Sequence, residues 1–264
     1  MAEKYTREQL VSFTDAIRSA AGAVAEVNPS FYIVSLNGGL PLFDVMSVLD
    51  RNVDSQRAIY LPGSSKINNC ADVLTNCFEN FFLEKRDQSD DVMPLVSLDE
   101  VVSGRSVERL FNSYNAASRR VMRAQYGASQ KQKDLVEFEA LQLRNQFPLS
   151  VFGIREIRPA GSKLDQTYLG RVKKGEVREY FTDKIITMDD PDYQTVEFAH
   201  PNTKGFVGTA FQPRVQQIIL KRPYLDLLAD IARYIGVDPE TVHPERTRVV
   251  SDCDKYSRKP QYNH

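Results

Sequence analysis

The chain has 264 residues, of which 42% are hydrophobic and 26% are charged, as in an ordinary globular protein. Its formal net charge of −1 excludes an overall basic field of the kind that holds nucleic acid. No apolar run approaches the roughly 20 residues that span a bilayer, so we expect no association with a membrane.

Cysteine usage points to a reducing compartment. Cys70, Cys77 and Cys253 are too few and too scattered for a disulfide framework or a zinc cluster. The spacing of Cys70 and Cys77 places both on one helix face, so we expect them to be reduced core residues. The N-terminal residues form an amphipathic pattern and not a signal peptide. The protein is therefore expected to be cytoplasmic.

Helical and strand patterns alternate over the first part of the chain. Apolar residues at helical spacing predict a helix over 6–27, with Thr6 as its N-cap. β-branched and aromatic residues predict a strand over 31–36. The loop Asn37-Gly38-Gly39 follows this strand, and Pro41 stands near the first turn of the next helix.

A second strand is predicted over 57–61. The loop 62–66 follows and ends in Lys66, which is either a solvated lysine or a residue that reaches a bound anion. Residues 71–86 then show a helical pattern and a polar connector follows them. The apolar face of this helix consists of Val73, Leu74, Cys77, Phe78 and Phe81.

The stretch 93–107 carries the strongest functional pattern of the chain. An apolar run over 95–98 predicts a buried strand, which leads into the carboxylates Asp99 and Glu100. A small, hydroxyl-rich turn follows, Ser103-Gly104-Arg105-Ser106. After this turn the pattern becomes helical, with an apolar face formed by Val107, Leu110, Phe111 and Tyr114.

Strand, loop and helix in this order is typical of a phosphate-binding site. The free N–H groups and the dipole at the start of a helix attract an anion. Gly104 allows the backbone to approach a ligand closely. Ser103 and Ser106 offer hydroxyl donors, and Arg105 adds positive charge. The alternative is an ordinary strand–turn–helix unit with a capped helix.

Two long helices are expected next. The first continues from this turn through 119–123, where Arg119, Arg120 and Arg123 cluster. The cluster either forms a solvated face or contacts a protein or nucleic-acid partner.

The second helix covers 129–145. Leu135, Phe138 and Leu141 mark its expected apolar side, and Leu143 is expected to extend that side near the end. Residues 147–154 then predict a fourth strand.

The pattern changes beyond residue 155, where glycines separate short segments. A helix is predicted over 223–234, and the tail after residue 248 is polar. Further strands are expected over 176–181, 184–188 and 195–198, and 215–220 fits a strand or a helix start.

Aromatic and histidine side chains in this region have an ordinary alternative to a functional role. Tyr168, Tyr180 and Phe181 either stack on a nucleobase or belong to the core. His200 and His243 each stand beside a proline and outside any metal-type spacing, so we expect them in loops.

The alternation of helices and strands predicts an α/β fold with a mostly parallel sheet flanked by helices. We expect a core over 1–160, which includes an N-terminal helix and a helical insertion near 115–146. The residues 161–264 are expected to form a C-terminal extension, or hood, of α+β character. Ligands of such sheets bind beyond the carboxyl ends of the strands, where both candidate loops lie.

The stretch 93–107 resembles the phosphoribosyl-pyrophosphate (PRPP) motif of type I phosphoribosyltransferases. Leu95 to Leu98 are similar to the strand of that motif, Asp99 and Glu100 to its acidic pair, and 103–106 to its phosphate turn. The sequence departs from the motif in one respect. Aligned on the turn, Asp99 falls on the second acidic position and Leu98 on the first. Aligned on the acidic pair, the loop is one residue short.

The resemblance, which covers roughly residues 30–155, implies a magnesium-dependent transfer of a phosphoribosyl group to or from a nucleobase-like acceptor. It implies that Asp99 and Glu100 are catalytic and that Asp99 holds Mg²⁺, directly or through water. It also implies two sets of substrate-binding residues. The 5′-phosphate would be bound by Ser103, Gly104, Arg105 and Ser106, and pyrophosphate by Asn37, Gly38, Gly39 and Lys66.

The departure in the acidic pair supports an alternative with the same fold. A catalytically degenerate protein would sense PRPP or a nucleotide, or serve as a subunit of a protein or protein–nucleic acid assembly. A homodimer, and a partner bound through the Arg119–Arg123 region, are compatible with either function.

Overall fold

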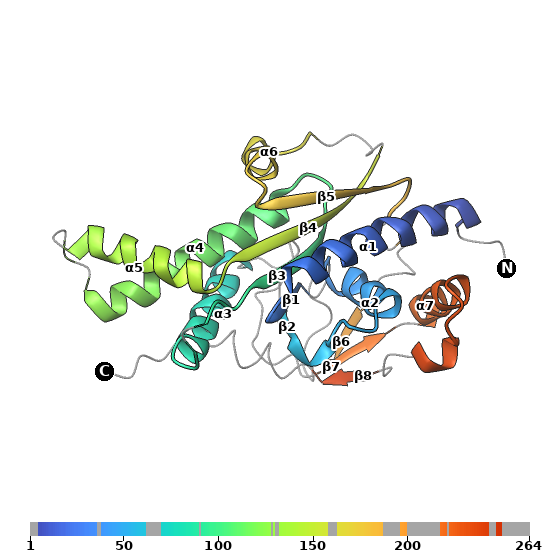
Figure 1. The fold of residues 1–264 in the computed structure, drawn as a ribbon, viewed down its shortest axis with the longest axis horizontal. Coiled ribbons are helices and arrows are strands. Elements are labelled where there is room, and N and C mark those ends of the chain that lie inside the picture. Colours follow the sequence, from blue (N-terminus) through green and yellow to red (C-terminus); the bar gives the residue numbers. More distant parts are fainter. Residues whose placement is uncertain are drawn as a thin grey trace.

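A five-stranded sheet whose strands all run parallel forms the centre of the protein (Figure 1). The computed structural model describes residues 5–35, 38–61, 70–89, 91–127, 129, 132–157, 163–186, 196–199, 217–220, 222–242 and 247–249. The strand order is β2-β1-β3-β4-β5. The strands are β1 (Phe31–Ser35), β2 (Ala58–Leu61), β3 (Leu95–Glu100), β4 (Leu149–Glu156) and β5 (Val177–Thr182).

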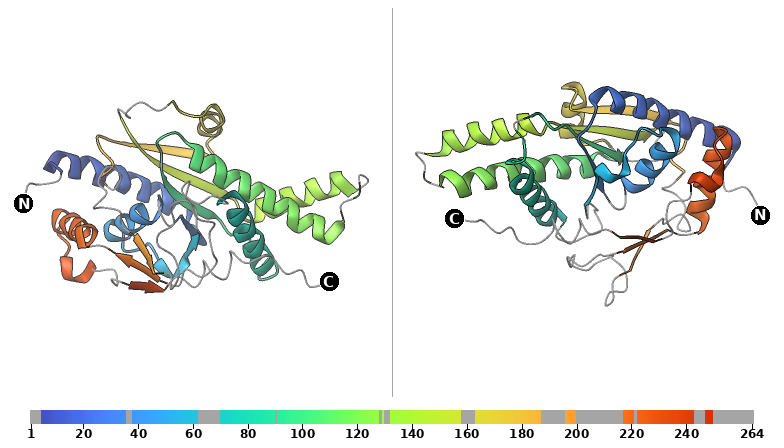
Figure 2. Two further views of the ribbon diagram at one scale, coloured as in Figure 1. Left: turned by 180° about the vertical axis from the view of Figure 1, so that it is seen from behind. Right: turned by 60° about the horizontal axis from the view of Figure 1, so that its bottom comes forward.

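Helices cover both faces of this sheet (Figures 1 and 2). On one face, α1 (Arg7–Val27) contacts β4, β5 and α2 (Leu40–Leu49). On the other face, α3 (Cys70–Lys85) packs on α4 (Arg105–Tyr126), which also contacts α6 (Gln166–Lys173). The predicted α/β class, a parallel sheet flanked by helices, is therefore confirmed.

Local signals in the sequence explain where several helices begin and what they bury. Thr6 accepts a hydrogen bond from the Gln9 amide at 3.2 Å, and the Gln9 side chain accepts one from the Thr6 amide at 2.9 Å. This capping box confirms the predicted N-cap. Cys70 and Cys77 are both buried thiols on α3, as expected, whereas Cys253 lies outside the described residues.

The chain changes its direction across the sheet at β1 and β3. From β1 it passes to β2 on one side, returns across β1 to β3, and continues to β4 and β5. Such a switch leaves a crevice between the carboxyl ends of the two central strands, and ligands of open parallel sheets bind there. Here the crevice lies between the end of β1 at Ser35 and the end of β3 at Glu100.

The C-terminal residues form the expected α+β extension. The antiparallel strands β6 (Val196–Ala199), β7 (Gln217–Leu220) and β8 (Thr247–Val249) make a second sheet. Next to it α7 (Arg222–Tyr234) packs against α2, where the Tyr224 hydroxyl donates to Asp44 Oδ2 at 2.9 Å. Two 3-10 helices, η1 (Ser55–Arg57) and η4 (Pro239–Val242), complete the described elements.

The parallel sheet extends beyond the boundary expected at residue 160. The segment predicted as an exposed strand over 176–181 is β5, which pairs in parallel with β4. It therefore belongs to the core sheet and not to the extension. The strand expected over 184–188 does not form over its described residues, 184–186, which are a loop that buries Ile185 and Ile186.

The helices α4 and α5 (Lys133–Gln146) form a hairpin that projects from the body of the protein (Figure 1). The apolar side predicted for α5 is wrong, because Leu135, Phe138 and Leu141 are exposed. The buried side chains of α5 are Val136, Ala140 and Leu143.

Polar contacts explain this orientation of α5. Arg119 pairs with Glu137 at 2.9 Å, and Arg144 donates to Ser118 Oγ at 2.8 Å, so both bonds turn the adjacent side of α5 toward α4. Ala140, at the centre of that side, allows the two helix backbones to approach closely.

Two leucines of α5 provide a matched test of this orientation. Leu143 is 5% exposed and Leu141 is 47% exposed. We expect Leu143→Ala to lower the free energy of unfolding by about 2 kcal/mol, and Leu141→Ala to change it by less than about 0.5 kcal/mol. Urea denaturation measures both. Equal losses, or a larger loss for Leu141→Ala, would contradict the orientation of the helix.

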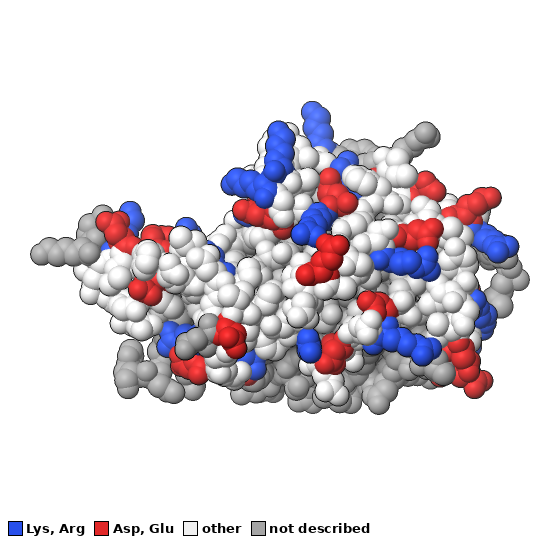
Figure 3. All heavy atoms as spheres, in the orientation of Figure 1, with Lys and Arg blue, Asp and Glu red and all other residues white. Residues whose placement is uncertain are grey.

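The charge distribution on the surface and the character of the helices can be compared with the composition of the chain. Acidic and basic side chains are interspersed on the face drawn in Figure 3. Within the described ranges, no helix combines the length and the apolar character that crossing a bilayer requires.

Candidate functional site

The switch in the sheet brings together two loops that were singled out from the sequence. The chain leaves β1 through Gly38 and Gly39 into α2, and it leaves β3 through residues 101–104 into α4. A Cβ placed on Gly38 would lie 2.8 Å from Asp99 Oδ1. The first loop therefore lies directly against the acidic end of β3.

Gly39 is held even more tightly than Gly38. A Cβ at this position would lie 2.8 Å from the Leu98 carbonyl oxygen and 3.0 Å from the Ser35 amide nitrogen. The Gly39 amide donates to Ser35 Oγ at 2.9 Å. Since backbone atoms surround Gly39, any side chain here would force β1 and β3 apart.

The turn between β3 and α4 has the conformation that its glycine predicts. Gly104 has a φ of 79°, which is the left-handed region, and its carbonyl accepts the first helical hydrogen bond from the Glu108 amide at 3.0 Å. Arg105 and Ser106 are the first residues of α4, and their side chains are exposed. The amide groups of this first turn are the donors that an anion would meet.

Asp99 is the buried acid of the site, with 7% of its surface exposed. Its Oδ2 accepts a hydrogen bond from Ser106 Oγ at 2.5 Å, which links the carboxylate to the first turn of α4. Burial raises the pKa of Asp99 to about 6. The hydrogen bonds from Ser106 and from the Glu100 amide, and the positive charge of Arg109, act against this rise in pKa.

The two carboxylates of the predicted acidic pair do not point the same way. Asp99 and Glu100 are consecutive residues of β3, so their side chains face opposite sides of the sheet. Asp99 faces Ser106 on α4 and lies beside Gly38. Glu100 is partly exposed and contributes its backbone amide to Asp99. The structure thus joins Asp99 to both loops, and the Glu100 amide supports the Asp99 carboxylate.

The short helix α6 packs against the turn between β3 and α4. The Tyr168 ring is fully buried against Gly104, where an added Cβ would lie 2.3 Å from Tyr168 Cγ. The Asp165 amide donates to the Ser103 carbonyl at 2.9 Å. The Tyr168 hydroxyl donates to Glu179 on β5 at 2.8 Å. The position of the turn therefore depends on α6 as well as on β3 and α4.

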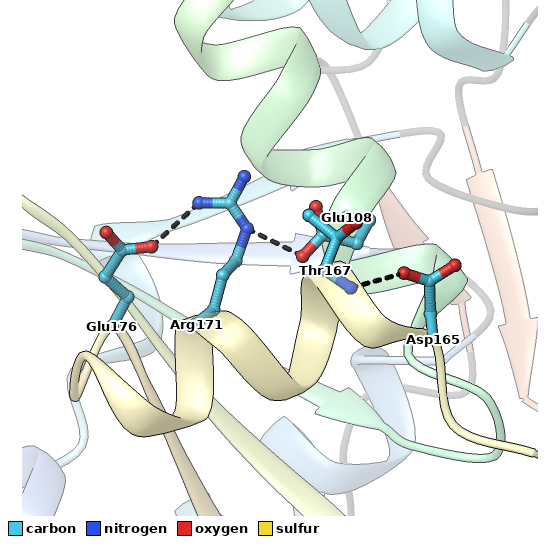
Figure 4. Close-up of polar contacts among 5 residues, drawn as sticks. All are labelled: Glu108, Asp165, Thr167, Arg171 and Glu176. Carbon is cyan, nitrogen blue, oxygen red and sulfur yellow. Dashed lines mark hydrogen bonds and ion pairs between the residues drawn. The ribbon is translucent and has the colours of Figure 1, made fainter.

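Arg171 of α6 forms ion pairs with Glu108 of α4 and with Glu176, which precedes β5 (Figure 4). Arg171 Nε donates to Glu108 Oε1 at 2.7 Å, and Arg171 NH1 donates to Glu176 at 2.8 Å. The same guanidinium lies 4.1 Å from the centre of the Phe111 ring. Asp165 caps α6 by accepting from the Thr167 amide at 2.8 Å.

The sequence analysis did not anticipate α6 or the roles of Tyr168 and Arg171. A signal was present, since Asp165 is a good N-cap and the helix carries Tyr168, Leu169 and Val172 at helical spacing. Arg109, whose charge acts on Asp99, was also missed, although it lies one helical turn beyond Arg105.

Several residues named from the sequence lie outside the described residues or elsewhere in the fold. Asn37, Lys66, His200 and His243 are outside the described residues. Tyr168 is a core residue, Tyr180 is partly buried, and Phe181 is 50% exposed at the end of β5.

The arginine cluster of α4 is largely engaged within the chain. Arg119 pairs with Glu137, and Arg120 pairs with the buried Glu79 at 3.6 Å. Arg123 is exposed in the last turn of the helix.

The described residues contain no group of three or more His, Cys, Asp or Glu side chains that is placed to hold a metal ion. Asp99 is the carboxylate of the crevice, and one of its oxygens already accepts from Ser106. This donor set fits Mg²⁺ only if most of the metal's ligands are water and oxygens of a bound phosphate compound, as is common for this ion.

No model of a protein family matches the chain, and no curated protein matches it in sequence.

Proposed function

We propose that the protein binds PRPP, or the 5′-phosphate of a nucleotide, in the crevice between β1 and β3. On this proposal it transfers the phosphoribosyl group to or from a nucleobase-like acceptor. One observation carries the proposal. The Gly38–Gly39 loop, the Ser103–Ser106 turn and the buried carboxylate of Asp99 converge at the switch point of a parallel sheet.

Each part would have a separate task in binding. The amides of the first turn of α4, with Ser103, Arg105 and Ser106, would hold the 5′-phosphate. The Gly38–Gly39 backbone, which lies directly beside Asp99, would bind the pyrophosphate through its amides.

In the reaction, the bond between the sugar C1′ and a pyrophosphate oxygen breaks and its electron pair leaves with pyrophosphate. A nitrogen of the acceptor supplies the electron pair of the new C1′–N bond. Positive charge develops on the sugar in between, and a carboxylate held nearby stabilises it. Asp99 is our candidate for this role, with Ser106 holding the carboxylate in place.

Mg²⁺ is the cofactor that the proposal requires, and it would neutralise charge on the departing pyrophosphate. Water molecules on the ion would contact Asp99. We further propose a cytoplasmic location, in line with the two buried thiols of α3.

A second candidate function has its own supporting observation. Leu98, which stands at the first acidic position of the motif, is a buried apolar residue of β3 with 2% exposure. A site with one acid in place of two suits a protein that binds PRPP or a nucleotide without turnover. Pyrophosphate release that is lost in Asp99→Asn would exclude this alternative.

Calorimetric titration of PRPP, with and without Mg²⁺, tests the proposal. We expect Ser106→Ala to weaken PRPP binding about tenfold, or by about 1.4 kcal/mol, because Asp99 loses the hydrogen bond that holds its carboxylate in place.

Ser19→Ala provides the control, since Ser19 is an exposed serine of α1 whose hydroxyl donates to the Asp15 carbonyl of the same helix. If wild-type protein shows no magnesium-dependent binding, the proposed ligand is wrong.

A further inference from the structure

A second hollow lies between α3 and α4, beginning at the first turn of α4. Its volume of about 470 Å³ is within the range of small-molecule sites. We call it the α3–α4 groove, and its lining residues are Ala71, Asp72, Thr75, Arg105, Glu108, Arg109, Asn112, Ser113, Ala116 and Arg120. It extends along the helical layer and not into the crevice between β1 and β3.

Arginines give the groove a site for an anion. Arg105 and Arg109 follow each other on successive turns of α4, and neither makes a hydrogen bond or ion pair within the described part of the chain. Like charges at this spacing repel each other, and a bound anion would remove the repulsion. Arg120, farther along the groove, already pairs with Glu79.

The acids of the groove limit the ligand to a compact molecule. Asp72 and Glu108 line the groove together with the arginines, so a long polyanion would meet both signs of charge. The volume likewise fits one small molecule. The anion therefore belongs to a ligand that is mostly uncharged.

The rest of the lining leaves room for a flat group and offers it the Asn112 amide. Ala71 and Ala116 have small side chains, which leave room between the helices. The hydroxyls of Thr75 and Ser113 both donate hydrogen bonds to the Ala71 carbonyl. The Asn112 amide is exposed on the groove.

One carboxylate oxygen of Glu108 accepts no hydrogen bond from the described groups. Arg171 binds its Oε1, whereas its Oε2 is buried and has no hydrogen-bond partner among the described groups (Figure 4). A buried acceptor of this kind favours any rearrangement that offers it a donor.

We propose that the α3–α4 groove binds a mononucleotide, with its phosphate between Arg105 and Arg109 and its base toward Asn112. This site does not depend on the PRPP proposal and extends away from the crevice, although Arg105 belongs to both sets of residues. Since Arg109 also acts on Asp99, occupancy of the groove would alter the charge that the switch-point crevice experiences.

Titration of AMP into the full-length chain tests this site, with Arg109→Gln as the variant. The substitution removes no described hydrogen bond or ion pair, so the fold should persist, and circular dichroism checks this. We expect AMP to bind wild type and to bind Arg109→Gln at least about tenfold more weakly. Arg123→Gln, which changes an exposed arginine of the same helix outside the groove, should bind as wild type does.

Further titrations separate the two sites and the two parts of the ligand. Asp99→Asn should leave AMP affinity within about threefold of its original value, whereas saturating PRPP should weaken AMP binding, because both ligands would engage Arg105. Loss of AMP binding in Asp99→Asn would place AMP in the crevice and overturn the proposal. Adenosine and inorganic phosphate should each bind more weakly than AMP. The proposal is also overturned if AMP does not bind, if Arg109→Gln binds it normally, or if phosphate alone binds equally well.

Discussion

Replacing Gly104 with valine should lower the free energy of unfolding by about 2–5 kcal/mol. Two costs add up at this position. A side chain in the left-handed region, here at a φ of 79°, costs about 1–2 kcal/mol. A Cβ would also lie 2.3 Å from Tyr168 Cγ, and overpacking of a buried ring costs about 1–3 kcal/mol. Urea denaturation of the two proteins measures the sum.

Two other glycines separate these costs. Gly175 has a φ of 74° but no atom within 4 Å of its Cβ position, so Gly175→Val should show the backbone cost alone. Gly170 lies within α6 and also has open space around it, so Gly170→Val should cause little loss. If Gly104→Val costs no more than Gly175→Val, then Tyr168 does not pack against the turn.

This expectation differs from the one that the sequence alone supports. From the motif, a substitution at Gly104 should weaken phosphate binding without unfolding the protein. The structure adds Tyr168, which comes from a helix that the sequence analysis did not anticipate. Gly104 would let a ligand approach the backbone on one side, and the Tyr168 ring packs against it on the other.

The core strands could be predicted because their signals are local. The run at 31–35 is mostly β-branched or aromatic and the run at 95–98 is mostly apolar, as is typical of buried parallel strands. The convergence of the two loops could be predicted for the same reason, because parallel strands end at one edge of a sheet. The loops after β1 and β3 could therefore be identified from the sequence without knowing the distance between the two strands.

The missed features depend on contacts between distant residues. β5 mixes polar and apolar residues, and its pairing with β4 shows that it belongs to the core sheet. On α5 two apolar stripes are present at helical spacing, and the choice between them follows from Arg119 and Arg144. Sequence periodicity identifies an apolar stripe but not the partner that covers it.

Asp99→Asn should increase the free energy of unfolding at neutral pH by as much as about 3 kcal/mol. The pKa of Asp99 is about 6 in the folded protein, against 3.8 for an ordinary aspartate, and each pKa unit corresponds to about 1.36 kcal/mol. Asparagine fills the same space without charge, and its oxygen can still accept the hydrogen bond from Ser106. A weakened bond to Ser106 would reduce the gain.

The pH dependence gives the sign of this effect. Below about pH 4, Asp99 is protonated in both states and contributes nothing to the difference. Between about pH 4 and about pH 6 the folded state binds more protons than the unfolded state, so the contribution of Asp99 lowers stability as pH rises. Above about pH 6 the full cost of the buried charge is present. Asp99→Asn should remove this part of the pH dependence.

The same substitution should abolish the proposed transfer reaction and weaken magnesium-dependent PRPP binding by at least about tenfold, because it removes the charge of the crevice. Urea denaturation at about pH 4 and about pH 7, together with PRPP titration, measures both effects. Asp134→Asn, at an exposed carboxylate of α5, should change neither. A variant that is more stable but inactive would mean that the fold retains a costly buried charge for function. If Asp99→Asn instead destabilises the protein and leaves PRPP binding unchanged, Asp99 is a structural residue and the site lies elsewhere.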